Sequence, residues 1–143
     1  MKYYDPRMHT AEHILNAVMD YMFACGRSIS SHIEKKKSKC DYNLKRTLTR
    51  PEIKAVADTV NSIIRSGIDV REEFITMEEA IKEFFRNELP GHIKGNVRII
   101  KIGNFDTCPC IGGHVSNTAE IGEFIITSID HENDRLRLRF RLK

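Results

Sequence analysis

Four candidate metal ligands lie in two pairs near opposite ends of the sequence. His9 and His13 are four positions apart, and so are Cys110 and His114. If the first pair is helical, both imidazoles lie on one face, because residues four apart are neighbours on a helix. A cysteine and a histidine from a second segment could then complete a zinc site of about four nitrogen and sulfur ligands. Since about 100 residues separate the pairs, the fold must bring them together, which is typical of an active site rather than of a small zinc finger.

The spacing alone leaves other interpretations open. His9 and His13 could be partly exposed helix histidines, with Cys110 a buried thiol. Glu12 also completes a His-x-x-Glu-His pattern, the inverted metallopeptidase motif, in which the glutamate is the general base. Against that motif, helical geometry predicts that Glu12 points away from the two histidines and is solvated. Cys108 could replace Cys110 as a ligand, and spacing does not separate the two thiols.

The composition is that of a chain that buries its own core. With 143 residues, of which 41% are hydrophobic, the sequence suggests one domain over residues 1–143 without disulfide staples. Neither a run of about 18 apolar residues nor an apolar signal stretch is present. We therefore expect a soluble cytoplasmic protein with no membrane partner, whose four cysteines are reduced or bind metal. The net charge of +3 permits a nucleic-acid partner without requiring one.

Start and stop signals predict three helices. An N-cap followed by proline begins the first, and Ser/Thr-x-x-Glu capping boxes begin the other two. Glycine or proline follows each expected end. These signals predict helices that start at Asp5-Pro6, Thr49 and Thr76 and end near Cys25, near Gly67 and before Pro90.

Strand-like segments occupy most of the remaining sequence. They are residues 29–33, 40–44, 69–74, 97–102, 124–129 and 135–142. The clearest is the last, where arginine alternates with leucine and phenylalanine. Helices and strands do not follow a regular βαβ order. We therefore predict an α+β fold, a two-layer arrangement of helices packed on a mainly antiparallel sheet in a single domain.

Two motifs resemble those of the alanyl-tRNA editing domain, which also occurs as free-standing AlaX-type proteins and, more distantly, in threonyl-tRNA synthetases. The sequence around His9 and His13 resembles the first motif, and residues 110–122 resemble the second. Landmarks between them, such as Asp41-Tyr42, follow in the family's order. The resemblance covers nearly the whole chain and fits the short form, which has no extra N-terminal barrel.

The resemblance implies a zinc-dependent hydrolase, with one zinc ion per chain, that removes a wrong amino acid from tRNA. The positions that match the family's metal ligands are His9, His13, Cys110 and His114. The implied substrate is serine, or sometimes glycine, misattached to the alanine tRNA, bound through the acceptor end. The family usually reads Cys-Gly-Gly-Thr-His, so Gly113 lacks a hydroxyl group and the choice of amino acid stays open.

The count of ligands raises a question about the mechanism. Four protein ligands are typical of a closed structural zinc site, whereas catalysis needs an open position. Either Cys110 or His114 is released, or the metal takes a fifth ligand, or zinc only orients the substrate. We expect zinc-bound water to attack the ester, and no protein base is assigned.

The substrate pocket is expected to recognise a hydroxyl group. A synthetase pocket sized for alanine excludes serine poorly, because serine only adds a hydroxyl. A second site that bonds this hydroxyl can discriminate well, since an unpaired buried donor is costly. The candidates are Thr10, Ser28, Ser30, Ser31 and Thr118, together with Gly112 and Gly113, which allow a tight loop around a ligand.

Two basic clusters are candidates for binding the tRNA backbone. Alternate residues of a strand are about 6.8 Å apart, close to the spacing of RNA phosphates. Phosphate contacts would make binding salt-sensitive without giving sequence specificity. The alternative is an ordinary solvated surface, an arginine-rich edge strand and a lysine-rich turn that block edge pairing. The candidates are Arg137, Arg139 and Arg141 on the last strand and Lys35, Lys36, Lys37 and Lys39 on the turn before residue 40.

Three functional classes are compatible with the sequence. The first is an editing deacylase, favoured by the two motifs and their order. The second is a small zinc metallopeptidase that depends on Glu12. The third is a non-catalytic zinc-binding and tRNA-binding module that keeps the fold. The sequence does not define the oligomeric state.

Overall fold

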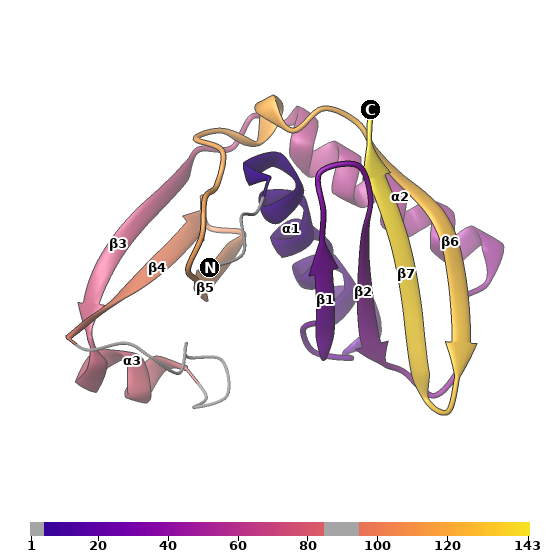
Figure 1. Ribbon diagram of the computed structural model, residues 1–143, viewed down its shortest axis with the longest axis horizontal. Helices are drawn as coiled ribbons and strands as arrows, with labels where there is room; N and C mark the ends of the chain where they lie inside the picture. The colour runs from indigo at the N-terminus through magenta and orange to yellow at the C-terminus, as the bar shows by residue number, and fades with distance from the viewer. Residues whose placement is uncertain (1–4, 85–94) are drawn as a thin grey trace.

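Two antiparallel sheets lie on either side of the first helix (Figure 1). The structure, a computed structural model, describes residues 5–84 and 95–143. The elements are α1 (Pro6–Phe23), β1 (Ser30–Ile33), β2 (Ser38–Asn43), α2 (Arg50–Arg65), β3 (Val70–Thr76), α3 (Met77–Glu83), β4 (Asn96–Ile102), β5 (Asp106–Pro109), η2 (Thr118–Glu120), β6 (Phe124–Glu132) and β7 (Arg135–Leu142). The predicted α+β class is confirmed, but the single predicted sheet is divided into two, with strand orders β1-β2-β7-β6 and β3-β4-β5.

The predicted helix starts are confirmed. The Asp5 side chain accepts two backbone N–H bonds at the start of α1. Thr49 and Thr76 form reciprocal capping boxes at the starts of α2 and α3. Helix α1 ends at Ala24 in a left-handed conformation, close to the predicted end. The predicted end of the third helix, before Pro90, lies outside the described residues. No helix among the described residues is long and apolar enough to cross a membrane.

The main core lies between the four-stranded sheet and the helices α1 and α2. Strand β7 contributes Leu136, Leu138 and Phe140, all fully buried, while its arginines lie on the opposite face of the sheet. Because β7 pairs with both β2 and β6, it is an interior strand. The alternative of an arginine-rich edge strand therefore does not apply, because the arginines cover the outer face of the sheet and not an edge.

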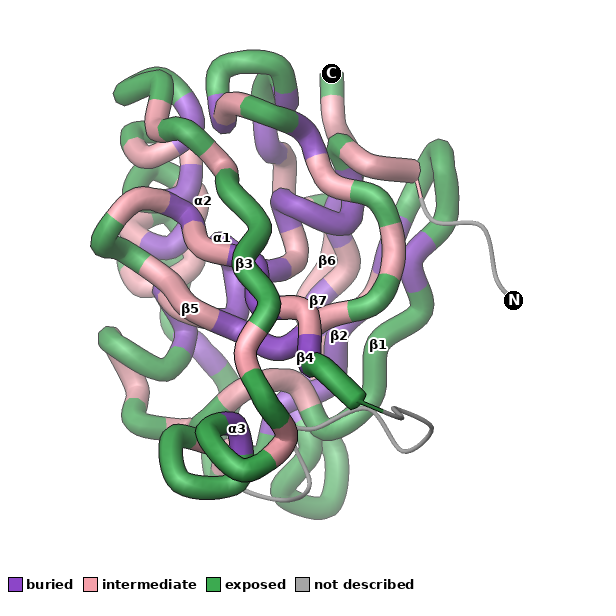
Figure 2. Tube along the Cα trace, turned by 90° about the vertical axis from the view of Figure 1, so that its left-hand side faces the viewer, coloured by how far each residue is buried: buried purple, intermediate pink, exposed green. Residues whose placement is uncertain are grey.

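The three-stranded sheet has a smaller core of its own. Val97 and Ile99 of β4 pack with Ala80 of α3 on one face. The register of β4 and β5 places Asp106 and Cys108 on the other face, toward α1. Figure 2 views the molecule from outside the small sheet, with α1 behind it, and shows the edge strand β3 largely exposed. Strand β5 was not predicted, because a four-residue strand that ends in proline has no clear alternation.

Candidate metal centre

The two pairs of candidate ligands meet between α1 and the loop that follows β5. Helix α1 places His9 and His13 on one face, one turn apart, and both are buried. The loop brings Cys110 and His114, which are half-buried, against them. The four ligand atoms all lie within 4.8 Å of one another. The fold therefore assembles a cluster that could hold a metal ion.

The ligand loop is held in place by its own backbone and by Arg98 of β4. The guanidinium of Arg98 donates to the carbonyl oxygens of Cys110 at 3.3 Å and Gly112 at 2.7 Å. Gly112 has φ of 113°, a conformation that L side chains rarely adopt, so this position requires glycine. A Cβ at Gly113 would only meet Pro6 at an ordinary contact of 3.5 Å. Of the two glycines predicted to bend the loop, only Gly112 is needed for its conformation.

Two of the three histidines are oriented through their Nδ1 atoms. His9 Nδ1 lies 3.0 Å from the carbonyl oxygen of Gly113, and His9 Nε2 lies 3.2 Å from Cys110 Sγ. His114 Nδ1 lies 2.9 Å from Thr10 Oγ1, which also accepts the N–H of Val115 at 3.2 Å. Donation from Nδ1 fixes each ring and directs Nε2 toward a metal, as is usual for histidine ligands.

Buried polar atoms without partners mark this centre. Among the described residues, the only such side-chain atoms are His13 Nδ1, His114 Nε2 and Asp106 Oδ2. An unpaired buried polar atom costs about 1–3 kcal/mol. A metal ion bound by His114 Nε2 would remove one of these costs. The residues present therefore fit a metal ion with nitrogen and sulfur ligands, and the donor set suits zinc.

The surroundings lower the pKa values of two candidate ligands, Cys110 and His114. Burial would raise the pKa of the Cys110 thiol, but hydrogen bonds from His13 and His9 lower it to about 6. Burial lowers the pKa of His114 to about 2, so its imidazole is neutral at pH 7. Thiolate and neutral imidazole are the forms that bind zinc.

The pKa of His13 is shifted in the direction opposite to that of His114. Burial would lower the pKa of His13, but Asp106, Cys108 and Cys110 together raise it well above 6.5. In the protein without metal, His13 therefore carries a proton near neutral pH. Metal binding at His13 would release that proton, which makes metal affinity dependent on pH.

Residues 97–138 match the family model described as the threonyl and alanyl tRNA synthetase second additional domain. The chain is 33% identical to the alanine–tRNA ligase of Fervidobacterium nodosum over 85% of its own length. It is 32% identical to the ligase of Rickettsia akari over 84%, and 32% identical to that of Methanococcus aeolicus over 90%. The resemblance to this synthetase domain is confirmed. The chain spans about 14% of the length of each of these ligases.

Glu12 does not point into solvent as predicted. Its side chain is only 13% exposed, and its Oε1 lies 3.9 Å from His13 Nε2. The prediction was wrong because it placed Glu12 by its angle on an isolated helix, and it left out the sheet that covers this side of α1.

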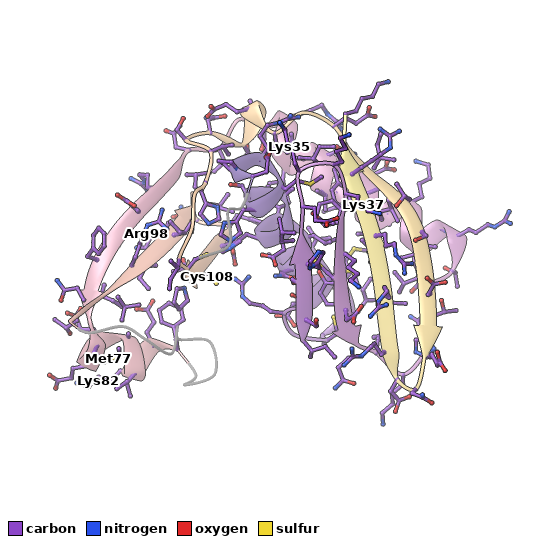
Figure 3. All side chains as sticks on the ribbon, in the orientation of Figure 1. Lys35, Lys37, Met77, Lys82, Arg98 and Cys108 are labelled. Atoms are coloured by element: carbon purple, nitrogen blue, oxygen red, sulfur yellow. The ribbon has the colours of Figure 1, made fainter. Side chains whose placement is uncertain are left out.

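Cys108 belongs to the surroundings of the cluster and not to its four ligands. It is buried on β5, on the face of the small sheet that is directed toward α1 (Figure 3). The structure thus separates the two thiols that the spacing left equivalent. Cys110 reaches the histidines because the chain leaves β5 after Pro109.

Two hydroxyls predicted to read the substrate are engaged elsewhere. Thr10 is buried and accepts bonds from the ligand loop, so it supports His114. Thr118 accepts the N–H of Ile68 at 2.9 Å and contacts the last carbonyls of α2 at 3.2 Å. This bonding argues against both threonines as substrate readers.

The predicted serines lie on different faces of the large sheet. Ser30 pairs with Asp41, whose side chain bonds arginines on the outer face, so Ser30 lies away from α1. Strand alternation directs Ser30 away from α1, which argues against its predicted place in the pocket. Ser31 lies on the α1 side, and its hydroxyl is 2.6 Å from that of Ser28. Ser28 and Ser31 remain candidate readers.

The two predicted basic clusters differ in how far their charges are neutralised. Arg137 bonds Asp41, and Arg139 bonds Asp130. By contrast, the lysines at the tip of the β1–β2 hairpin are exposed, as Figure 3 shows for two of them. Those exposed lysines are Lys35, Lys36 and Lys37, whereas Lys39 is half-buried and Arg141 is exposed on β7.

Sequence analysis missed three charged residues at the centre: Asp106, Arg27 and Arg98. Asp106 could have been noticed, since it stands two residues before Cys108 and shares its strand face. Arg27 and Arg98 carry no local signal, because their partners are distant in sequence.

Proposed function

We propose that this protein is a zinc-dependent editing hydrolase that deacylates mischarged alanine tRNA. The observation that carries the proposal is the cluster of His9, His13, Cys110 and His114, in a chain similar to a domain of tRNA synthetases. The proposed substrate is serine on the alanine tRNA, with glycine on the same tRNA as a second one. The cytoplasm is the proposed site of action.

The four clustered side chains would hold one zinc ion. When bound, zinc would polarise the ester carbonyl or acidify a water molecule. His9 and His13 are buried, whereas Cys110 and His114 are half-buried. The proposed approach of the substrate is therefore from the side of the ligand loop. Ser28 and Ser31 are the proposed partners for the hydroxyl of a seryl group.

The hairpin lysines are the proposed contact for the tRNA backbone near the acceptor end. Lys35, Lys36 and Lys37 are exposed at the tip between β1 and β2. Each phosphate contact made by a lysine would contribute to a dependence of binding on salt. The arginines of β7 are the weaker candidates, because Arg137 and Arg139 already pair with carboxylates.

The test is hydrolysis of seryl, glycyl and alanyl esters of the alanine tRNA by zinc-loaded protein. We expect fast loss of serine, with alanine spared, and loss of this activity in His9→Ala. His32→Ala is the matched control, since His32 is exposed and pairs only with Glu34. If zinc is bound and no ester is hydrolysed, the editing proposal fails. Retained tRNA binding would then favour the non-catalytic module.

Glu12 supports a second candidate function. Its half-buried position beside His13 suits the general base of the inverted metallopeptidase motif. Peptide hydrolysis by the zinc-loaded protein, lost in Glu12→Gln, would favour this function over editing.

A further inference from the structure

Asp106, at the start of β5, is a buried carboxylate that does not belong to the four candidate ligands. Its side chain is 9% exposed. Its Oδ2 has no hydrogen-bond partner among the described residues. A buried charge of this kind is costly unless it is paired and hydrogen-bonded. The position of Asp106 therefore calls for a partner.

The atom that faces Asp106 lacks a partner too. His13 Nδ1 is buried without a hydrogen bond, and it lies 3.8 Å from Asp106 Oδ2. A closer approach of about 0.6 Å would bring the two atoms into hydrogen-bonding range. The two unpartnered atoms are thus complementary, one a ring nitrogen and the other a carboxylate oxygen.

The other oxygen of the carboxylate is already held. Arg27, in the segment between α1 and β1, reaches Asp106 Oδ1 with its guanidinium at 2.5 Å. Because Oδ1 is fixed by this ion pair, the carboxylate presents Oδ2 to His13. The ion pair between Arg27 and Asp106 also joins the segment that follows α1 to the small sheet.

Of the three histidines in the cluster, two have an acceptor for Nδ1, and His13 has none among the described residues. His9 has the carbonyl oxygen of Gly113 as the acceptor for its Nδ1, and His114 has the hydroxyl of Thr10. A histidine that binds metal almost always donates its other ring N–H to an acceptor, which fixes the tautomer and the ring orientation. Among the side chains described around His13, Asp106 Oδ2 faces its Nδ1.

We propose that Asp106 is a positioning residue for the metal centre, accepting a hydrogen bond from His13 Nδ1–H, and that Arg27 holds the carboxylate in place. His13 then presents Nε2 to the metal. The proposal rests on the metal centre of the proposed function and not on the editing reaction. It assigns roles to two residues outside the predicted ligand set.

The test is the zinc affinity of Asp106→Asn, measured by competition with a chelator. Loss of an outer acceptor typically costs 10–100-fold in metal affinity, so we expect a weakening of about that size. Asp130→Asn is the matched control, because it also removes a carboxylate from an arginine pair, on the outer face of the large sheet. Its zinc affinity should equal that of the wild type. Arg27→Gln should weaken zinc binding less than Asp106→Asn.

A double-mutant cycle separates positioning from a general effect on folding. If Asp106 acts through His13, Asp106→Asn should cause no further loss of affinity in a His13→Ala background. The absorption spectrum of the cobalt-substituted protein gives a second readout, and Asp106→Asn should change the ligand-field bands while Asp130→Asn leaves them unaltered. Equal losses in both backgrounds with unaltered bands, or no loss in Asp106→Asn, would overturn the proposal. Since tRNA is absent from these measurements, failure of the editing proposal would not affect their outcome.

Discussion

At the scale of single residues, Thr10 connects the two segments that carry the ligands. Its buried hydroxyl forms hydrogen bonds with His114 Nδ1 and with the N–H of Val115. Thr10→Val keeps the shape but leaves these groups unpaired, so the free energy of unfolding should fall by about 1–3 kcal/mol. Urea denaturation measures this change. Thr127→Val is the control at an exposed position, and equal stability of the two variants would contradict the role given to Thr10.

The two adjacent glycines of the ligand loop give a second prediction at this scale. Gly112 has φ of 113°, whereas Gly113 has no such constraint and has room for a Cβ. Gly112→Ala should destabilise the protein by about 1–3 kcal/mol through backbone strain. Gly113→Ala should be nearly neutral. Thermal unfolding of the pair measures the difference, and a reversed order would show that the loop adopts another conformation in solution.

The four residues of the cluster could be predicted from the sequence, but their surroundings could not. The positions of His9 and His13 on one helix face follow from local spacing alone. Glu12 was misplaced, and Asp106 was missed, because both depend on which distant strand packs against α1. Strand alternation also decides that Ser31 and not Ser30 lies on the α1 side, but only once the pairing of β1 with β2 is known.

At the scale of elements, Asp41 joins β2 to β7 on the outer face of the large sheet. It accepts bonds from Arg137 at 2.8 Å and Arg135 at 3.0 Å. The hydrogen bond from Arg137 is the main cause that lowers the pKa of Asp41 below 3.8, and burial opposes it. Asp41 therefore contributes stability that is fully present above about pH 3.8 and is lost as the pH falls through its lower folded-state pKa.

The corresponding prediction concerns acid unfolding. Asp41→Asn should cost about 1–3 kcal/mol at pH 7, because hydrogen bonds to charged groups are lost. Its stability should then fall less steeply than that of the wild type below about pH 4, where the wild type loses the contribution of Asp41. Denaturant unfolding over a pH series tests both. Asp58→Asn, at an exposed helix pair, should change neither, and parallel pH profiles for wild type and Asp41→Asn would refute the assignment.

At the scale of the whole molecule, the metal centre lies where α1 meets the small sheet. Ile102 of β4 belongs to the main core, and β5 contacts α1, so both strands join the small sheet to the rest of the molecule. Zinc that binds only the folded form should stabilise it by about 2.7 kcal/mol at a free concentration 100 times the dissociation constant. Calorimetry with zinc, and after chelation, measures the shift in Tm. No shift would mean that the cluster does not bind zinc in the folded protein.

The whole fold was predictable in class but not in arrangement. Capping boxes and alternation located the helices and most strands, because these signals are local. The division into two sheets depends on pairings such as β2 with β7, between residues about 95 positions apart. The sequence pattern of β7 predicts a half-buried strand, but it does not contain the information that β7 lies between β2 and β6.

The interior position of β7 has a consequence for how the protein is made. The strand that completes the large sheet is synthesised last, after every other element described. Until the ribosome has released residues 135–142, β2 can pair only with β1. The buried side chains of β7 are also absent from the core that contains the apolar face of α1. Pairings over such long separations also form slowly. A nascent chain halted before this strand would contain all four candidate ligands without the fold that gathers them. The ability to bind metal would therefore report that residues 135–142 have been added and paired.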